Sequence, residues 1–439
     1  MSFKELNLNS ALLNAINDLG FTQPTTIQHK VFSEVMAGKD IVGLAQTGTG
    51  KTLAYLLPLL RMWTYQKNKT PQILVLVPTR ELVTQVLEEV EKLSKYMNFS
   101  ATGAYGGTNI KTQMMAILNG VDLVVATPGR LIDLLLNGTI KTKGIKKLVI
   151  DEMDEIMNLG FRTQLNNILD LLPPKRQNLL FSATITDEVE QLLDVYFNNP
   201  VKIEAAPMGT PLENITQICY EVPNFNTKVN LLKYLLANDS EMNKVLIFTA
   251  TKTLADEIYE LLLTELPDEI GVIHSNKAQN ARFLAVNRFK EGSYKILIAT
   301  DLVARGIDIS EVSHVINLDT PQIPENYIHR IGRTGRADKK GIAITFTSVF
   351  EMESKDEIEH LMNFTIPVKA LPETVEISDV LIADEKPRIV MPNYKNKKSS
   401  EEVGPAFHEK KAKNKKVNQN MRRSEALRAK YGKPKTKRK

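Results

Sequence analysis

The stretch AQTGTGKT, residues 45–52, decides the fold of the first half of the chain. It stands between two apolar runs, Ile41–Leu44 and Leu53–Leu57, and therefore predicts a loop that joins a buried strand to a helix. Small residues in such a loop let backbone N–H groups close around phosphate oxygens, and the helix start adds positive potential. Lys51 brings a charge to the outer phosphates, and the Thr52 hydroxyl can bind Mg²⁺. The pattern predicts a nucleoside triphosphate site, although its first position is alanine rather than the usual glycine.

Short apolar runs continue beyond this loop and alternate with helical patterns such as Leu82–Leu93. The runs are apolar at nearly every position, which is typical of parallel strands covered by helices on both faces. They predict a doubly wound α/β domain, whose ligands bind outside the carboxyl ends of the strands. The runs are Ile73–Val77, Leu123–Ala126, Leu148–Ile150 and Leu179–Phe181.

Two acids directly follow the run Leu148–Ile150. Because Asp151 would stand at the tip of a buried strand beside the phosphate loop, it can hold Mg²⁺, largely through water. Glu152 is then placed to orient or deprotonate the attacking water. The alternative interpretation is an acidic helix start, which the helix dipole favours.

The second half repeats the alternation of strands and helices but has no second phosphate loop. It carries the string YIHRIGRTGRA, residues 327–337, in which Arg330, Arg333 and Arg336 recur at every third position. Planar guanidinium groups are the usual trans-acting stabilisers of phosphoryl-transfer charge. A solvated basic helix is the alternative, but the two glycines within the string disfavour it. The predicted strands are Lys244–Thr249, Ile296–Ala299, Val315–Leu318 and Ile342–Phe346.

Charge is distributed unevenly along the chain of 439 residues, whose net charge is +5. Residues 386–439 hold 19 basic and four acidic side chains, a net of +15. The first 385 residues hold 37 basic and 47 acidic side chains, a net of −10. An acidic body with a basic, Lys- and Asn-rich tail that is poor in large apolar residues predicts a disordered segment and a polyanionic partner.

The single cysteine, Cys219, excludes a disulfide within the chain and suits a reducing compartment. The first residues lack an apolar signal-peptide core, and no apolar run approaches the roughly 18 residues of a membrane span. We therefore expect a cytoplasmic protein without a membrane segment.

Taken together, the polar strings make the chain resemble a DEAD-box RNA helicase over roughly residues 3 to 350. Each string alone is a modest signal, whereas the ordered set is highly specific. In chain order the strings are GFTQPTTIQ (20–28), AQTGTGKT (45–52), PTREL (78–82), Gly106–Gly107, TPGR (127–130), DEMD (151–154), SAT (182–184), ATDLVARGID (299–308) and HRIGRTGR (329–336).

The resemblance implies two tandem RecA-like domains that close over ATP, Mg²⁺ and one RNA strand. It implies that Phe3 stacks on adenine, that Gln28 reads the adenine edge with Thr25 nearby, and that Asp308 reaches the ribose. The phosphates and Mg²⁺ would be held by Thr47, Gly48, Thr49, Gly50, Lys51, Thr52 and Asp151. Catalysis would fall to Lys51, Asp151, Glu152, Arg333 and Arg336.

Two further groups of residues are implied in the same way. Coupling between hydrolysis and domain closure would fall to Asp154, Ser182, Thr184 and His329. RNA phosphates would meet Arg80, Gly107, Thr127, Arg130, Gln279, Arg282 and Thr300. Contacts of this kind address the RNA backbone rather than the bases, so the core should tolerate any sequence.

The chain departs from the family pattern at Met153, where the motif that names the family has alanine. That position carries none of the chemistry, so we expect altered packing rather than lost activity. The segment Ser275–Ala278, just before Gln279 and Arg282, matches the family only loosely.

The sequence thus predicts an α/β protein with a RecA-like ATP-binding domain at residues 1–206 and a linker at 207–213. A second RecA-like domain is expected at 214–372, with a basic tail at 373–439. The expected function is RNA-stimulated ATP hydrolysis that unwinds short duplexes or remodels RNA–protein complexes. An ATP-gated RNA clamp with incidental turnover is the alternative, whereas a small-molecule kinase explains neither the arginine repeat nor the tail.

Overall fold

The computed structural model describes residues 2–45, 49–67, 70–204, 214–301, 309, 312–335, 340–382 and 385. Some of the predicted features fall outside these residues and are not addressed by the structure. They concern Thr47, Gly48, Asp308, Arg336, the linker at 207–213 and the basic segment 386–439.

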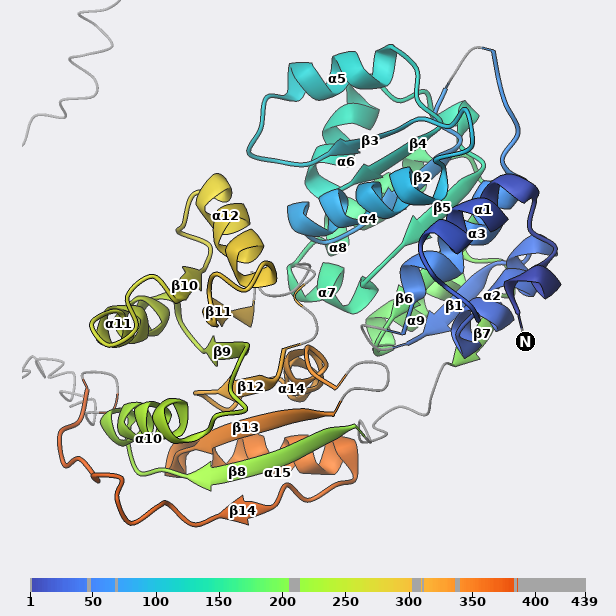
Figure 1. Ribbon diagram of the computed structural model, residues 1–439. Coiled ribbons are helices and arrows are strands. Elements are labelled where there is room, and N and C mark those ends of the chain that lie inside the picture. Colours follow the sequence, from blue (N-terminus) through green and yellow to red (C-terminus); the bar gives the residue numbers. More distant parts are fainter. Residues whose placement is uncertain are drawn as a thin grey trace, which may run out of the picture. The chain divides into compact units, whose positions relative to one another are not determined.

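The first half of the chain forms a seven-stranded sheet in the order β3-β4-β2-β5-β6-β1-β7 (Figure 1). All of its strand pairs are parallel. The strands are β1 (Ile41–Leu44), β2 (Ile73–Leu76), β3 (Ala101–Ala104), β4 (Leu123–Ala126), β5 (Lys147–Ile150), β6 (Gln177–Ser182) and β7 (Val201–Glu204).

Helices cover both faces of this sheet. One apolar cluster joins it to η1 (Phe3–Leu6), α1 (Ser10–Asp18), α2 (Thr26–Met36), α3 (Lys51–Met62) and α4 (Arg80–Leu93). A second cluster joins the other face to α5 (Ile110–Leu118), α6 (Pro128–Leu136), α7 (Met153–Asn158), α8 (Arg162–Leu171) and α9 (Asp187–Tyr196).

Strand β2 shows why the strands read as continuous apolar runs. Ile73 and Val75 point into one cluster, whereas Leu74 and Leu76 point into the other. Because successive side chains of a strand face opposite sides, a sheet covered on both faces needs apolar residues at every position.

The second half forms another parallel seven-stranded sheet, in the order β10-β11-β9-β12-β13-β8-β14. The strands are β8 (Ile215–Glu221), β9 (Val245–Thr249), β10 (Ile270–Ile273), β11 (Ile296–Thr300), β12 (His314–Asn317), β13 (Gly341–Thr347) and β14 (Val368–Lys369). Helices α10 (Phe225–Asn238) and α11 (Lys252–Leu263) cover one face. Helices α12 (Gln279–Lys290), α14 (Pro324–Ile331) and α15 (Met352–Met362) cover the other.

The chain after β14 stays attached to the second sheet beyond the predicted boundary at residue 372. Val375 is buried, and the side-chain amide of Asn226 donates to the Val380 carbonyl at 2.7 Å. The Phe225 N–H, at the start of α10, donates to the Glu385 carboxylate at 2.6 Å. Packing therefore continues to Glu385, immediately before the basic segment.

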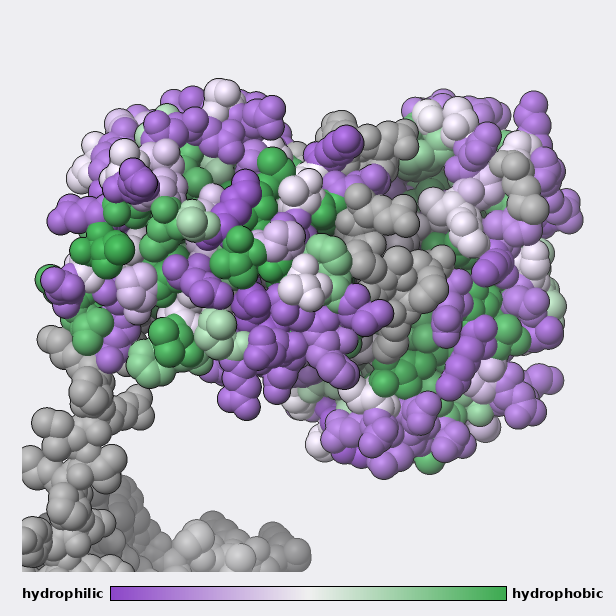
Figure 2. Space-filling view, turned by 90° about the horizontal axis from the view of Figure 1, so that it is seen from below, coloured by the Kyte–Doolittle hydropathy of each residue, from purple (hydrophilic) through white to green (hydrophobic). Residues whose placement is uncertain are grey.

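The two-domain α/β architecture agrees with the sequence-based prediction of tandem doubly wound sheets. Figure 2 shows one face of the molecule, on which hydrophilic and hydrophobic side chains are interspersed. Among the described residues, no helix combines the length and the apolar character that crossing a membrane requires.

Candidate active site

The phosphate loop leads from β1 into α3, and a segment before β1 holds it in place. Gly50 has a φ of +86°, and a Cβ there would lie 2.3 Å from the amide nitrogen of Gln28, so only glycine fits. The Thr25 hydroxyl donates to the Thr49 carbonyl at 3.0 Å, and Gln28 Nε2 donates to the Gly50 carbonyl at 3.2 Å. Both side chains implied to lie near adenine thus contact the loop in this structure.

Phe3, the other residue implied in adenine binding, lies in η1 and is buried in the first apolar cluster. Lys51 opens α3 and is only 7% exposed. Its ammonium group acts on both acids of DEMD, because it counteracts the effect of burial on the pKa of Asp151 and of Glu152.

Asp151 stands at the carboxyl end of β5 and is 4% exposed. Its Oδ1 accepts a hydrogen bond from the Glu152 N–H at 3.0 Å, and its Oδ2 accepts one from the Tyr55 hydroxyl at 3.1 Å. Burial raises the pKa of Asp151, and the nearby Lys51 charge opposes that rise. Burial also raises the pKa of Tyr55 far above its ordinary value, so the tyrosine remains a hydrogen-bond donor.

Tyr55 is a residue that the sequence analysis missed. It lies four positions after Lys51 on α3, and residues spaced by four share one face of a helix. The spacing of four from Lys51 was the only hint in the sequence that Tyr55 faces the ATP site. Because Tyr55 stands within an apolar run, the sequence instead predicts a packing role in the core.

Glu152 is held in an uncommon backbone conformation, with a φ of +51° where α7 begins. Non-glycine residues seldom adopt left-handed geometry, and such strain concentrates at functional sites. Burial raises the pKa of the Glu152 carboxyl, whereas the charges of Lys51 and Arg333 lower it. A carboxylate with a raised pKa suits proton acceptance from water.

The donor set around Asp151 fits a Mg²⁺ ion that is bound together with a nucleotide. Among the described residues, no group of three or more His, Cys, Asp or Glu side chains could hold a metal ion. Mg²⁺ commonly keeps several waters and uses one or two carboxylates plus substrate phosphates. The Asp151 carboxylate and the Thr52 hydroxyl would be the protein ligands of such an ion, with the phosphates and water completing its coordination.

Hydrogen bonds connect the end of β6 to α7. The Asp154 N–H donates to Ser182 Oγ at 3.1 Å, and the Ala183 N–H donates to Asp154 Oδ2 at 3.1 Å. His329 Nε2, from α14 in the second half, lies 3.8 Å from the same Asp154 oxygen. Thr184 follows two residues after the end of β6 and is half-buried. Three of the four implied coupling residues, Asp154, Ser182 and His329, thus lie together.

Arg333 lies just after α14 and is buried. Because its charge lowers the pKa of Glu152, the guanidinium of the second half acts on the acid of the first half.

A groove of about 630 Å³, at the carboxyl ends of the first sheet and the start of α12, is lined by five of the seven residues implied to meet RNA phosphates. They are Arg80, Thr127, Arg130, Gln279 and Arg282. Gly107, beside this groove, has a φ of +77°, and a Cβ there would lie 2.3 Å from Arg80 Nη1. Thr300 ends β11 and does not line the groove.

Comparison with known proteins agrees with this geometry. The DEAD/DEAH box helicase family matches residues 25–192, and the helicase conserved C-terminal domain matches residues 227–338. The ATP-dependent RNA helicase DbpA of Bacillus subtilis is 38% identical over 380 residues, which cover 86% of this chain and 78% of the relative. The chain belongs to the DEAD-box family of ATP-dependent RNA helicases.

Other DEAD-box proteins match over similar lengths. The helicase CshA of Geobacillus kaustophilus is 40% identical over 360 residues, 82% of this chain and 76% of the relative. The structure of S. cerevisiae Dbp5 bound to RNA and ADP BeF3 has a TM-score of 0.76 at 31% identity and covers 84% of this chain and 95% of that chain. The structure of Mss116p bound to ssRNA and AMP-PNP has a TM-score of 0.77 at 27% identity. The match covers 85% of this chain and 80% of that chain.

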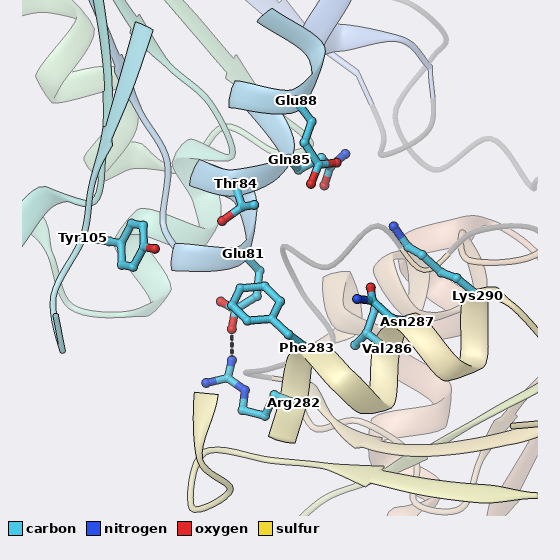
Figure 3. Close-up of a pocket in the computed structure, with 10 residues that line it drawn as sticks. All are labelled: Glu81, Thr84, Gln85, Glu88, Tyr105, Arg282, Phe283, Val286, Asn287 and Lys290. Carbon is cyan, nitrogen blue, oxygen red and sulfur yellow. Dashed lines mark hydrogen bonds and ion pairs between the residues drawn. The ribbon is translucent and has the colours of Figure 1, made fainter. Parts of the chain in front are cut away.

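Glu81, in the DEAD-box string PTREL, is a second residue that the sequence analysis missed. Its carboxylate accepts a hydrogen bond from Gln279 Nε2 at 2.9 Å and forms an ion pair with Arg282 (Figure 3). The pair borders a pocket of about 360 Å³ between α4 and α12. An RNA phosphate that approaches Arg282 would have to share its guanidinium with Glu81.

Arg330, the first arginine of the repeat, has a structural role. It is 2% exposed, and it donates to both Asp301 oxygens, to the Asn317 amide oxygen and to the Asp319 carbonyl. Its guanidinium also lies 5.1 Å from the centre of the Phe248 ring. Arg330 therefore ties α14 to the carboxyl ends of β9, β11 and β12.

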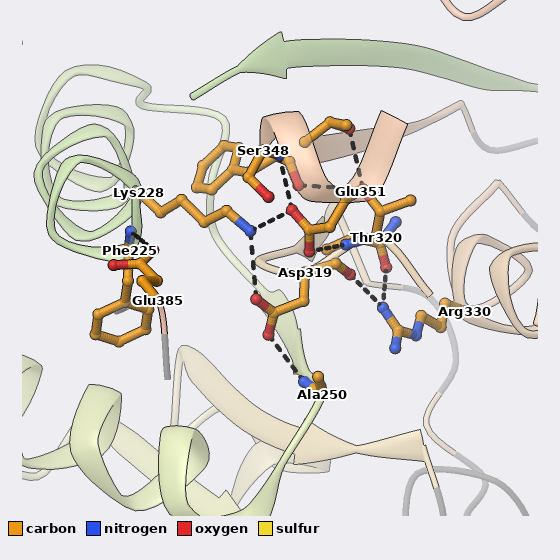
Figure 4. A network of polar contacts seen from close by, with 12 residues as sticks. Phe225, Lys228, Ala250, Asp319, Thr320, Arg330, Ser348, Glu351 and Glu385 are labelled. Atoms are coloured by element: carbon orange, nitrogen blue, oxygen red, sulfur yellow. Dashed lines mark hydrogen bonds and ion pairs between the residues drawn. The ribbon is translucent and has the colours of Figure 1, made fainter. Parts of the chain in front are cut away.

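The same region contains a second buried cation (Figure 4). Lys228 of α10 lies 3.3 Å from Asp319 Oδ1 and 2.8 Å from Glu351 Oε2. Asp319 also accepts from the Ala250 N–H at 2.9 Å, and Glu351 accepts from the Thr320 N–H at 3.1 Å. A hydrogen-bonded ion network of this kind holds the chain after β9, at Ala250, and the chain between β12 and α14, at Asp319 and Thr320.

Met153 is completely buried in the second apolar cluster of the first domain. Its side chain therefore packs in the core of the first domain. That this departure from the family pattern leaves activity intact stays a prediction.

Removing the Tyr55 hydroxyl should weaken the Mg²⁺ site without unfolding the protein. In Tyr55→Phe, the Asp151 carboxylate loses one buried donor, and outer partners of this kind commonly change metal affinity about 10–100-fold. We expect nucleotide binding to need roughly tenfold more Mg²⁺. A Mg²⁺ titration of fluorescent ATP-analogue binding measures this, with the exposed Tyr65→Phe as control. Equal Mg²⁺ midpoints for Tyr55→Phe and the wild type would show that Tyr55 serves packing alone.

Proposed function

We propose that this protein is an RNA-stimulated ATPase that separates short RNA duplexes or remodels RNA–protein complexes. Its chemistry requires that groups of the second RecA-like domain complete a site built on the first. The observation that carries the proposal is the contact between His329 of the second domain and Asp154 of the first, at 3.8 Å. The charge of Arg333, which lowers the pKa of Glu152, supports it.

Each residue of the candidate ATP site has a definite part in this proposal. Lys51 and the phosphate loop bind the outer phosphates. Asp151 and Thr52 would hold Mg²⁺, which would neutralise charge on the transferred phosphoryl group. Glu152 orients and deprotonates the attacking water. Arg333 and Arg336 stabilise the negative charge that develops in the transition state.

RNA binding is coupled to the ATP site through the second domain. RNA phosphates bind in the groove at Arg80, Thr127 and Arg130 and draw on Gln279 and Arg282 of α12. Because these contacts address the backbone, binding tolerates any sequence. Binding of one strand across both domains favours the arrangement in which Arg333 faces Glu152, so hydrolysis and RNA binding are linked.

The experiment that tests the proposal follows ATP hydrolysis and strand separation in the same reaction on a short duplex. We expect repeated turnover, with ATP hydrolysed as strands separate. A protein that hydrolyses ATP but holds the duplex intact through many turnovers would instead be a clamp.

The basic segment 386–439 adds affinity for RNA without reading its sequence. Deleting it removes a net charge of +15, and every motif of the ATP site lies before the cut. On single strands each phosphate neutralised by the protein contributes about −0.7 to the log–log salt slope, so removing six such interactions makes the slope shallower by about four units. ATP hydrolysis without RNA should persist.

Salt titrations of RNA binding by the full-length and truncated proteins measure this effect. The control replaces the segment with a neutral Gly/Ser sequence of equal length and should behave like the truncation. Identical salt slopes for all three proteins would show that the segment does not contact phosphates.

A further inference from the structure

A second polar hollow lies at the edge of the first sheet opposite to the ATP site. It measures about 1170 Å³ and is lined by residues that precede or begin β1, β5 and β6, together with the α9–β7 loop. Because all strands of this sheet are parallel, their amino ends share one edge and their carboxyl ends share the other. The hollow is therefore separated from the ATP and RNA sites by the length of the strands.

Five basic side chains line this hollow, against one carboxylate. They are Lys39, Lys146, Lys147, Lys175 and Arg176. The adjoining segment TIKTKGIKK, residues 139–147, adds Lys141 and Lys143 and contains no acid. This concentration of positive charge stands out because the first 385 residues carry a net charge of −10.

The one carboxylate of the hollow, Asp40, is occupied by the protein itself. Its Oδ1 accepts from the Asn178 N–H at 2.8 Å, and its Oδ2 accepts from the Asn198 N–H at 2.9 Å and from the Asn178 side-chain amide at 3.2 Å. Asp40 is buried, and its hydrogen bonds hold together the segments that line the hollow.

Two of the cations are set firmly into the hollow. Arg176 donates from Nε to Asn178 Oδ1 at 2.9 Å and from Nη1 to the Pro173 carbonyl at 2.9 Å. Lys147 donates to Gln177 Oε1. Burial lowers the pKa of both Lys147 and Arg176, although Asp40 opposes that effect, so an anion bound beside them would stabilise their charged forms.

The other three cations are available to a partner. Lys39 forms an ion pair with Glu34 at 2.8 Å, but both side chains are solvated, and such pairs are weak. Lys146 donates to a neutral group, Gln72 Oε1, at 3.2 Å, and Lys175 is exposed in the turn before β6.

We propose that this hollow is an auxiliary RNA-binding surface that holds the phosphates of RNA extending beyond the strand in the active-site groove. Several cations spread over a hollow of this size match a run of phosphates better than a single anion. The basic segment 386–439 would be repelled by these like charges, which leaves the surface to RNA. The inference rests on the proposed RNA-dependent function and adds to it a site for flanking RNA.

The experiment replaces these three lysines together, in Lys39→Gln/Lys146→Gln/Lys175→Gln. Binding of an RNA of about ten nucleotides, which one compact site can cover, and of one of about forty is measured across salt concentrations with a non-hydrolysable ATP analogue. A matched control, Lys30→Gln/Lys92→Gln/Lys95→Gln, removes three lysines of the same domain that lie outside the hollow.

For the long RNA, removal of three phosphate-binding charges should make the salt slope shallower by about two units. The ratio of the wild-type affinity to the variant affinity for the long RNA should therefore fall roughly twentyfold when the salt concentration rises fourfold. Binding of the short RNA, and ATP hydrolysis stimulated by it, should match the wild type. Long-RNA slopes that are equal for the wild type and the hollow variant, or reduced equally in the control, would overturn the inference.

These outcomes are separate from those of the proposed function. If short RNA fails to stimulate hydrolysis by the wild-type protein, the proposed function is wrong. If stimulation is normal and only the long-RNA slopes are unchanged, the auxiliary surface alone is wrong.

Discussion

Replacing Glu152 by glutamine should lower ATP hydrolysis by about 10²–10⁴-fold, the usual contribution of a positioned general base. The amide keeps the size and the hydrogen bonding of the side chain but cannot accept a proton. Burial already raises the pKa of this carboxyl, and its left-handed backbone aims it from the start of α7.

Binding should survive the same substitution, because Lys51 and Asp151 remain in place. The variant should hold ATP and RNA together and accumulate as a long-lived complex, visible as slow RNA dissociation in the presence of ATP. Single-turnover hydrolysis and RNA dissociation rates measure the two effects. The control, Glu188→Gln, alters an exposed acid that pairs with Arg162 on the surface. If Glu152→Gln hydrolyses ATP at a rate within a few-fold of the wild type, Glu152 is not the general base.

Arg333→Ala should have the largest effect of any single change, because arginine fingers contribute about 10³–10⁵ to kcat. Arg333 is buried and belongs to the second domain, and its charge lowers the pKa of Glu152 in the first. We expect RNA-stimulated kcat to collapse while ATP binding without RNA changes little.

Arg333→Lys distinguishes charge from geometry, since lysine keeps the charge but lacks the planar fork that matches phosphate oxygens. It should recover only a small part of the lost rate. Arg288→Ala, which removes an exposed guanidinium stacked on Tyr294, is the matched control. A large loss of ATP affinity without RNA in Arg333→Ala would mean that this arginine belongs to the ground-state binding site.

The fold was predictable because its pattern is local. A parallel strand covered on both faces must be apolar on both sides, as β2 and the first four residues of β9 are. This requirement can be recognised from a few consecutive residues. The phosphate loop and Asp151 were predictable for a related reason, because side chains that follow buried strands meet at the carboxyl edge of the sheet.

The contacts that hold the site in place were not predictable in this way. Tyr55 lies within an apolar run, and only the fold brings its hydroxyl to Asp151, which is 96 residues away in sequence. Glu81 meets Gln279 across 198 residues, so no local spacing announces their contact.

The arginine repeat shows the same limit. Its period of three does not distinguish Arg330 from Arg333. In the structure Arg330 lies in a buried ion network, whereas the charge of Arg333 lowers the pKa of Glu152. The basic hollow could not be predicted from the sequence, because its residues precede the strands and are scattered over several segments.

The central claim is that RNA completes the ATP site by bringing the arginines of the second domain to the acids of the first. It is tested most directly by the steady-state rate of ATP hydrolysis, at saturating ATP, as the concentration of a short single-stranded RNA is raised. We expect a slow basal rate and a saturable rise of orders of magnitude, which Arg333→Ala abolishes. A basal rate that equals the RNA-saturated rate would contradict it, because the site would then be complete without RNA.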